Sequence, residues 1–214
     1  MKELPVVGAE VLKFTEKYIS PRVVRRYSDI QMGEYDAFVA GSDQIWRPIY
    51  FGNIEDAFLK FTENWNVKRF AYAASFGTDV LEYTYEQLEA CSALLKRFDA
   101  VSVRESSGVE LCDEWFERED AVHVLDPVML LAPESYAALA SGAEARPAKG
   151  KVLSYIMDES KEKSAVAALA ARWLSTDIHD ASVFPRDLHR PLAERVVPSM
   201  EQWLACFEDA EFVV

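Results

Sequence analysis

Short apolar segments of two different periods alternate along this chain, and this alternation limits the folds that it can adopt. Apolar residues at Leu88, Cys91 and Leu95 recur every three or four positions, which predicts a helix packed by one face. Short apolar runs that stop at Gly, Ser, Asp or Arg predict buried strands at 35–40, 69–74, 100–103, 121–125 and 152–157. Strand, helix and strand in this order favour right-handed crossovers, so the sequence predicts an α/β fold with parallel sheets.

Several helix boundaries and faces can also be predicted. Ser106 or Ser107 is expected to cap the helix that follows strand 100–103. Ser199 and Gln202 have the spacing of a capping box before a further helix. The helix after strand 100–103 is expected to bury the stripe Val109, Cys112 and Phe116. Helical spacing is also present at Val7, Val11, Phe14 and Tyr18, and a strongly amphipathic helix is marked by Val166, Leu169, Ala170, Trp173 and Leu174.

A linker is predicted at residues 141–151, which are poor in large apolar side chains and contain Gly and Pro. It would separate an N-terminal domain, residues 1–140, from a partial C-terminal domain, residues 152–214. The second domain is short and ends on a predicted strand, 211–214, with no loop after it. Since ligands of parallel sheets bind on the loops that follow strands, this domain is expected to be incomplete.

The charge and the cysteines exclude several classes of protein. The chain of 214 residues has a net charge of −13 and no basic cluster of the kind that binds nucleic acid or an anionic membrane. Its three cysteines suit neither disulfides nor a zinc site, and buried thiols are expected. The three histidines have no metal-site spacing, and His123, inside a strand, is expected to be structural. No signal peptide or run of about 20 apolar residues is present, which favours the cytoplasm.

Polar residues stand directly after the predicted strands, where a doubly wound sheet gathers its ligand-binding groups. They are Ser42, Asp43, Ser75, Arg104, Glu105, Asp126 and Asp158. Ser and Asp at such junctions are also ordinary helix caps and turn formers, and this alternative applies to Ser75, Asp126 and Asp158.

Arg104 and Asp43 have the clearest chemical potential. Arg104, between a strand and a helix N-terminus, can hold a carboxylate or a phosphate, or it can form an ion pair with Glu105 or a neighbouring acid. Asp43 can act as a general base toward a sugar hydroxyl, or it can be a turn residue after Gly41. The five tryptophans are mainly expected to pack in the core and at turns, although Trp46 is close enough to Asp43 to help line a pocket.

Four short motifs occur in order and at characteristic distances. They are Gly41-Ser42-Asp43-Gln44-Ile45-Trp46, Tyr72-Ala73-Ala74-Ser75-Phe76-Gly77, Ser102-Val103-Arg104-Glu105 and Leu125-Asp126-Pro127. Together they resemble the polysaccharide pyruvyl transferase family, most clearly over residues 35–131 and more faintly to residue 214.

The resemblance implies Rossmann-like parallel-sheet units in a GT-B-like two-domain architecture whose second domain is incomplete. It implies transfer of the pyruvyl group of phosphoenolpyruvate onto two hydroxyls of a saccharide, giving a ketal for cell-surface polysaccharide. No cofactor is expected besides this donor, and no metal-binding residues are predicted. The acceptor can be lipid- or nucleotide-linked, and peripheral membrane contact and a homo-oligomer are compatible with this reading.

Residue roles follow from the same resemblance. Arg104 would pair with the anionic donor, and Asp43 would act at the reacting hydroxyl; these two are the predicted catalytic residues. Ser42, Trp46, Ser75, Glu105 and Asp126 would bind the substrates.

The chain also departs from the family pattern. Members similar to it begin with a strand and an Asn/Gly-rich turn and carry a Ser-Phe-His-Gly motif soon after the strand that matches residues 211–214; neither is present. The chain is therefore expected to be the middle part of a transferase. Two alternatives are a non-catalytic remnant that binds sugars or anions and a nucleotide-sugar glycosyltransferase of GT-B type.

Overall fold

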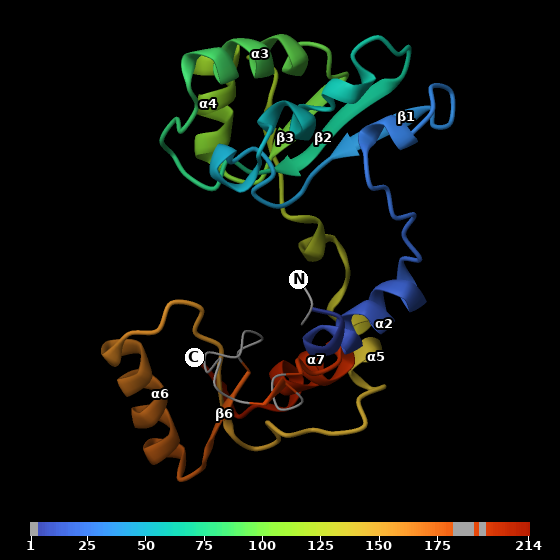
Figure 1. The fold of residues 1–214 in the computed structure, drawn as a ribbon. Helices are drawn as coiled ribbons and strands as arrows, with labels where there is room; N and C mark the ends of the chain where they lie inside the picture. The colour runs from blue at the N-terminus through green and yellow to red at the C-terminus, as the bar shows by residue number, and fades with distance from the viewer. Residues whose placement is uncertain (1–3, 182–190, 193–195) are drawn as a thin grey trace. The chain divides into compact units, whose positions relative to one another are not determined.

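The computed structural model describes residues 4–181, 191–192 and 196–214, with parallel β-sheets and α-helices in alternation (Figure 1). The strands are β1 (Ala37–Ala40), β2 (Lys68–Ala74), β3 (Ala100–Val103), β4 (Val122–His123), β5 (Val152–Ser154), β6 (Ile178–Asp180) and β7 (Phe212–Val213). The α-helices are α1 (Leu4–Val7), α2 (Ala9–Tyr18), α3 (Tyr85–Leu95), α4 (Ser106–Phe116), α5 (Pro133–Ala140), α6 (Lys161–Leu174) and α7 (Met200–Asp209).

Internal contacts divide the chain into two units. The central unit contains residues 23–131, and the terminal unit combines residues 1–22 with 132–214. This division differs from the expected linker at 141–151, because α5 packs closely on α7 and so joins residues 132–140 to the C-terminal part. Helix α2 also contacts α7, which places the N-terminal helix in the same unit.

The central unit contains a four-stranded sheet in the order β1-β2-β3-β4, in which every pair is parallel. Helix α3 connects β2 to β3, α4 connects β3 to β4, and the two helices pack on each other (Figure 1). Each strand was predicted from its apolar run, although β4 is limited to two residues. The predicted parallel α/β fold is therefore confirmed for this unit.

Stacked aromatic rings fill the core of the central unit. Trp46 is completely buried and lies parallel to Phe58, with ring centroids 4.9 Å apart. Phe116 of α4 stacks on Phe58 with ring centroids 5.8 Å apart, and Phe76 contacts the rings of both Trp46 and Phe116. Phe58 belongs to a 3-10 helix, Ile54–Phe58, in a segment without any predicted element. These rings anchor the loops that follow β1 and β2 to helix α4.

The start of α4 differs from the prediction. Glu105, not Ser106 or Ser107, is the N-cap residue, and no side chain caps the helix. Gly108 in the first turns packs against β3, where an added Cβ would lie 3.1 Å from the Cβ of Val103. The helix can therefore approach the strand closely enough for its buried stripe, with Cys112 and Phe116 fully buried, to enter the core as predicted.

The terminal unit contains a three-stranded parallel sheet in the order β6-β5-β7. Ser199 accepts from the amide of Gln202, and the Gln202 side chain returns to the amide of Ser199, so the predicted capping box before α7 is confirmed. Arg146 holds the other end of α7 through Asp209, at 2.7 Å. The amide of Gly150 also donates to the main-chain oxygen of Asp209 at 3.2 Å, so Arg146 and Gly150 both attach to the end of α7.

Helix α6 presents its alanine face to the sheet. Its buried residues are Ala167 and Ala171, which face β5 and β6, whereas Val166, Leu169 and Trp173 are exposed, Trp173 by 81%. The predicted helix is therefore present, but its large apolar residues do not face the sheet, because the small alanine side of the helix packs there.

All three cysteines are buried free thiols, as expected. Burial raises the pKa of Cys91 and of Cys112 to about 12, so both stay protonated near neutral pH. Within the described ranges, no helix combines the length and apolar character needed to cross a bilayer.

Candidate functional site

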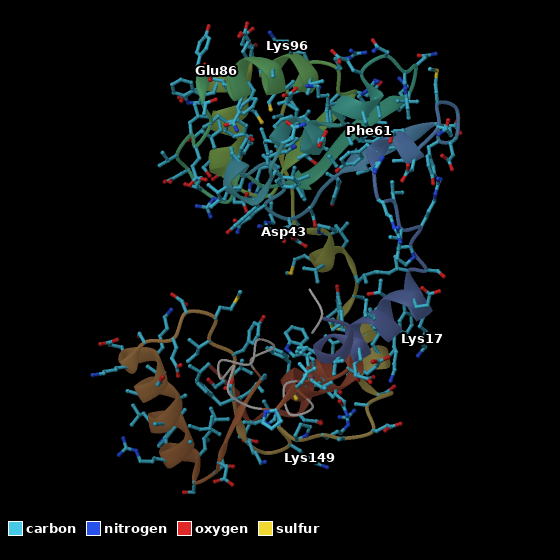
Figure 2. The ribbon with its side chains drawn as sticks, viewed as in Figure 1. Lys17, Asp43, Phe61, Glu86, Lys96 and Lys149 are labelled. Carbon is cyan, nitrogen blue, oxygen red and sulfur yellow. The ribbon has the colours of Figure 1, made fainter. Side chains whose placement is uncertain are left out.

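The predicted site residues of the central unit lie at the edge of the sheet where its parallel strands end. Residues 41–46 follow β1, residues 75–77 follow β2, and Arg104 follows β3. The parallel register of these three neighbouring strands brings the three loops to one edge. Asp43 lies at the end toward which the strands point (Figure 2). This is the position at which open α/β sheets bind ligands.

A close backbone contact fixes the loop after β1. An added Cβ on Gly41 would lie 2.1 Å from the main-chain oxygen of Tyr72 in β2, so only glycine fits there. The loops after β1 and β2 are joined by two further bonds: the Ser75 amide donates to the Asp43 carbonyl at 3.2 Å, and the Trp46 amide donates to the Ser75 carbonyl at 3.1 Å. The main chain at Asp43 is therefore held by the neighbouring strand.

Arg104 is at the centre of the site and contacts three carboxylates. Its Nε donates to Glu105 at 2.9 Å, and its Nη1 donates to Asp126 at 3.2 Å and lies 3.8 Å from Asp43. The hydrogen bond to Glu105, followed by that to Asp126, raises the pKa of the Arg104 guanidinium. The structure thus contains the ion pair that the sequence offered as the alternative to anion binding, and it brings four of the predicted residues together.

Asp126 connects this cluster to the next segment. Its Oδ1 accepts from the amide of Val128 at 3.0 Å and caps the 3-10 helix Pro127–Leu130, while its Oδ2 accepts from Arg104. The backbone bond to Val128, together with Arg104, holds the pKa of Asp126 below its usual value. Asp126 is therefore a cap, as the alternative reading had it, and also a partner of Arg104.

Arg104 retains donors for a ligand despite these pairs. Within the part of the chain that the structure describes, its Nη2 group donates no hydrogen bond. The first amides of α4 begin two residues after Arg104, and helix N-terminal amides have no intrahelical acceptors. Nη2 and this helix N-terminus can jointly bind a carboxylate or a phosphate. One guanidinium and three carboxylates give the cluster itself a formal charge of −2.

Two predicted substrate-binding residues lie below the surface. Trp46 is fully buried, and its Nε1 donates to the main-chain oxygen of Ala57. Ser75 is also fully buried, and its Oγ accepts from the amide of Gly77 at 2.9 Å. Both side chains therefore stabilise the loops from the interior of the unit. By contrast, the Asp43 carboxylate is 88% exposed and Ser42 is half-buried, so both can meet a ligand.

His123, which the sequence predicts to be a structural residue inside a strand, lies beside the site. It stands at the end of β4 with an exposed side chain, and its Nε2 lies 3.0 Å from the main-chain oxygen of Arg104. Its position two residues before the end of the apolar run 121–125, and three residues before Asp126, was the available signal.

Asp158 is not part of this cluster. It belongs to the terminal unit, where it pairs with Lys163 at 2.5 Å and Lys163 holds its pKa below the usual value. Among the described residues, no group of three or more His, Cys, Asp or Glu side chains is arranged to hold a metal ion.

Comparison with known proteins assigns the chain to a family. The family model described as polysaccharide pyruvyl transferase matches residues 5–214, nearly the whole chain. No curated protein matches the chain, and no solved structure does either. The match extends over all four motifs that form the strand-end cluster and over both structural units. The chain is a member of the polysaccharide pyruvyl transferase family.

Proposed function

We propose that the chain contributes the donor-binding half of a pyruvyl transferase that acts on a saccharide. The donor is phosphoenolpyruvate, and its C2 carbon becomes bonded to two acceptor oxygens while phosphate leaves. Of the two hydroxyl protons released, one ends on the methyl carbon of the new ketal and the other on phosphate. The cytoplasm, where phosphoenolpyruvate is made, is the proposed compartment, and a GT-B-like pairing of the two α/β units is the proposed architecture.

The single observation that supports the donor most strongly is Arg104. It combines an uncommitted Nη2 with a helix N-terminus directly after a parallel strand. A donor that carries both a carboxylate and a phosphate requires such donors. The three surrounding carboxylates leave the cluster with a formal charge of −2. Phosphoenolpyruvate must therefore either displace one of them from Nη1 or bind through Nη2 alone.

Asp43 is the proposed proton acceptor at the sugar hydroxyl. Its carboxylate is exposed beside Arg104, and one oxygen accepts from the amide of Gln44 at 2.8 Å, which fixes its orientation. A carboxylate that is positioned but uncovered can accept a hydroxyl hydrogen bond and take the proton as the C–O bond forms.

Phosphate release tests this proposal. Protein with phosphoenolpyruvate and an acceptor glycan is expected to release phosphate, and protein with phosphoenolpyruvate alone is not. Arg104→Ala is expected to abolish release, and Arg104→Lys to reduce it by about 10²-fold, because lysine keeps the charge but not the planar fork. Asp43→Asn is expected to lower kcat while leaving the KM for phosphoenolpyruvate unchanged.

Arg47→Lys is the matched control. Arg47 is an arginine of the same unit whose guanidinium is fully engaged by Glu82 at 2.8 and 2.9 Å. The proposal fails if Arg104→Ala turns over normally, or if Arg47→Lys loses as much activity as Arg104→Lys at equal stability.

A further inference from the structure

A groove of about 470 Å³ lies beside the strand-end cluster in the central unit. One wall is the loop Asp79–Leu81, which follows β2, and the other is the outer face of α4, which follows β3. Loops and helices that follow neighbouring parallel strands form the usual ligand cleft of such a sheet. The groove is therefore in the correct place for a substrate, outside the cluster itself.

The groove has an apolar floor and apolar rims. Leu111 is buried at its base, while Trp115 is 46% exposed and Val80 64% exposed on the two sides. An exposed tryptophan on a helix otherwise rich in acids is costly in water, because its large ring surface stays hydrated. The ring offers a flat apolar platform against which the C–H face of a sugar ring can lie.

Three carboxylates surround this platform: Asp79, Glu110 and Glu114. Within the described part of the chain, none of them forms an ion pair with Lys, Arg or His. Glu110 and Glu114 are also one helical turn apart, where like charges destabilise a helix. An aromatic platform with unpaired carboxylates presents hydrogen-bond acceptors for hydroxyl groups and repels anions.

Helix α4 extends from the candidate site along the groove. The first groove-lining residue on the helix is Ser107, in the turn that starts beside Arg104, and the last is Trp115, two turns further along. At a helical rise of about 1.5 Å per residue, this stretch is roughly 12 Å long, which accommodates two to three sugar rings.

We propose that this groove binds the acceptor as an extended, uncharged or basic saccharide chain, with a sugar ring on Trp115 and its hydroxyls on Glu110 and Glu114. The inference deepens the proposed function, since it assumes that the acceptor is a saccharide. It adds that residues away from the reacting sugar are recognised, and that anionic polymers are excluded.

Oligosaccharide binding in the absence of phosphoenolpyruvate tests the groove. The full chain is titrated calorimetrically with neutral hexamers of glucose, galactose and mannose and with an oligogalacturonate of equal length. At least one neutral hexamer is expected to bind, and the oligogalacturonate at least tenfold more weakly. Trp115→Ala is expected to weaken binding of the neutral hexamer at least tenfold. Glu114→Gln is expected to weaken that binding severalfold and to reduce the preference for the neutral hexamer over the oligogalacturonate.

Trp173→Ala is the matched control, because Trp173 is a more exposed tryptophan on α6, outside the groove. It is expected to bind as the parent does. The inference is overturned if no neutral hexamer binds, if Trp115→Ala binds as tightly as the parent, or if oligogalacturonate binds as tightly as the neutral hexamers. Binding that depends on Trp115 without any phosphate release would leave the groove standing and overturn the proposed function alone.

Discussion

The Nε2 of His123 lies 3.0 Å from the main-chain oxygen of Arg104, although 19 positions separate the two residues. This contact joins the end of the edge strand β4 to the turn between β3 and α4. The amide of Val124 donates to Val103 at 3.0 Å beside it, so the backbone on both sides of the contact is fixed. His123 is therefore a positioning residue for Arg104, because it acts on the main chain that carries the guanidinium.

Replacing His123 tests this positioning role. His123→Ala removes one hydrogen bond, which contributes about 1 kcal/mol, and is expected to raise the KM for phosphoenolpyruvate roughly fivefold with kcat within about twofold. His123→Gln, whose amide can donate to the same oxygen, is expected to restore most of the loss. Steady-state phosphate release measures both constants. An equal loss of kcat in both variants would instead indicate proton transfer by the imidazole.

The two carboxylate oxygens of Asp126 have different partners, so its capping role can be tested separately from its ion pair with Arg104. Asp126→Asn keeps an acceptor for the Val128 amide but loses the ion pair with Arg104, whereas Asp126→Ala loses both. The alanine variant is expected to lower the free energy of unfolding by about 1 kcal/mol more than the asparagine variant. Chemical denaturation at pH 7 measures the difference, and equal stabilities would contradict the capping role.

The pH dependence of that stability has a definite sign. Because the folded-state pKa of Asp126 is lowered, its contribution is fully present above the unfolded pKa, about 4, and is lost as the pH falls through the folded value. The stability difference between the parent and Asp126→Asn is therefore expected to be constant from pH 7 to about 5 and to shrink below about 4. A difference that already shrinks between pH 7 and 5 would show that another group is responsible.

Gly41→Ala is expected to displace the loop that carries Asp43. The new Cβ would lie 2.1 Å from a backbone oxygen of β2, which cannot move without breaking the sheet, so a loss of about 2–4 kcal/mol is expected. Gly52→Ala is the control, since no atom lies within 4 Å of its added Cβ. Thermal and denaturant unfolding compare the two, and a fully stable Gly41→Ala protein would contradict the close approach.

The strands and the site edge could be predicted because they depend on local pattern. Arg69–Ala74 and Ala100–Val103 are apolar runs whose ends identify the loops, and parallel pairing then brings Asp43 and Arg104 to one edge. Core packing was the general expectation for the tryptophans, but the stacking partner of Trp46 could not be predicted, because Phe58 lies in a 3-10 helix without apolar periodicity. The exposed face of α6 was also missed, since a hydrophobic stripe does not reveal which side of a helix meets the sheet.

Other features depend on contacts between segments that are distant in sequence. The sequence identifies Arg104 as an ion-pair or anion-binding residue. Its pairing with Asp126 and Asp43, however, results from the strand order β1-β2-β3-β4. The groove beside Trp115 likewise requires the loop after β2 to lie against α4. No periodicity along the chain encodes such neighbours.

Substitution of Trp46 tests whether its side chain acts in the core or binds a ligand. Trp46→Phe keeps a ring that can stack on Phe58 but loses the Nε1 bond to Ala57, and a destabilisation of about 1–3 kcal/mol is expected. Because the indole is fully buried, the KM values for donor and acceptor are expected to stay within twofold of the parent when measured well below the unfolding temperature. Trp65→Phe, at a half-buried position of the same unit, is the control and is expected to cost less than about 1 kcal/mol. A KM that rises severalfold in Trp46→Phe at unchanged stability would place the indole against a substrate and contradict its burial.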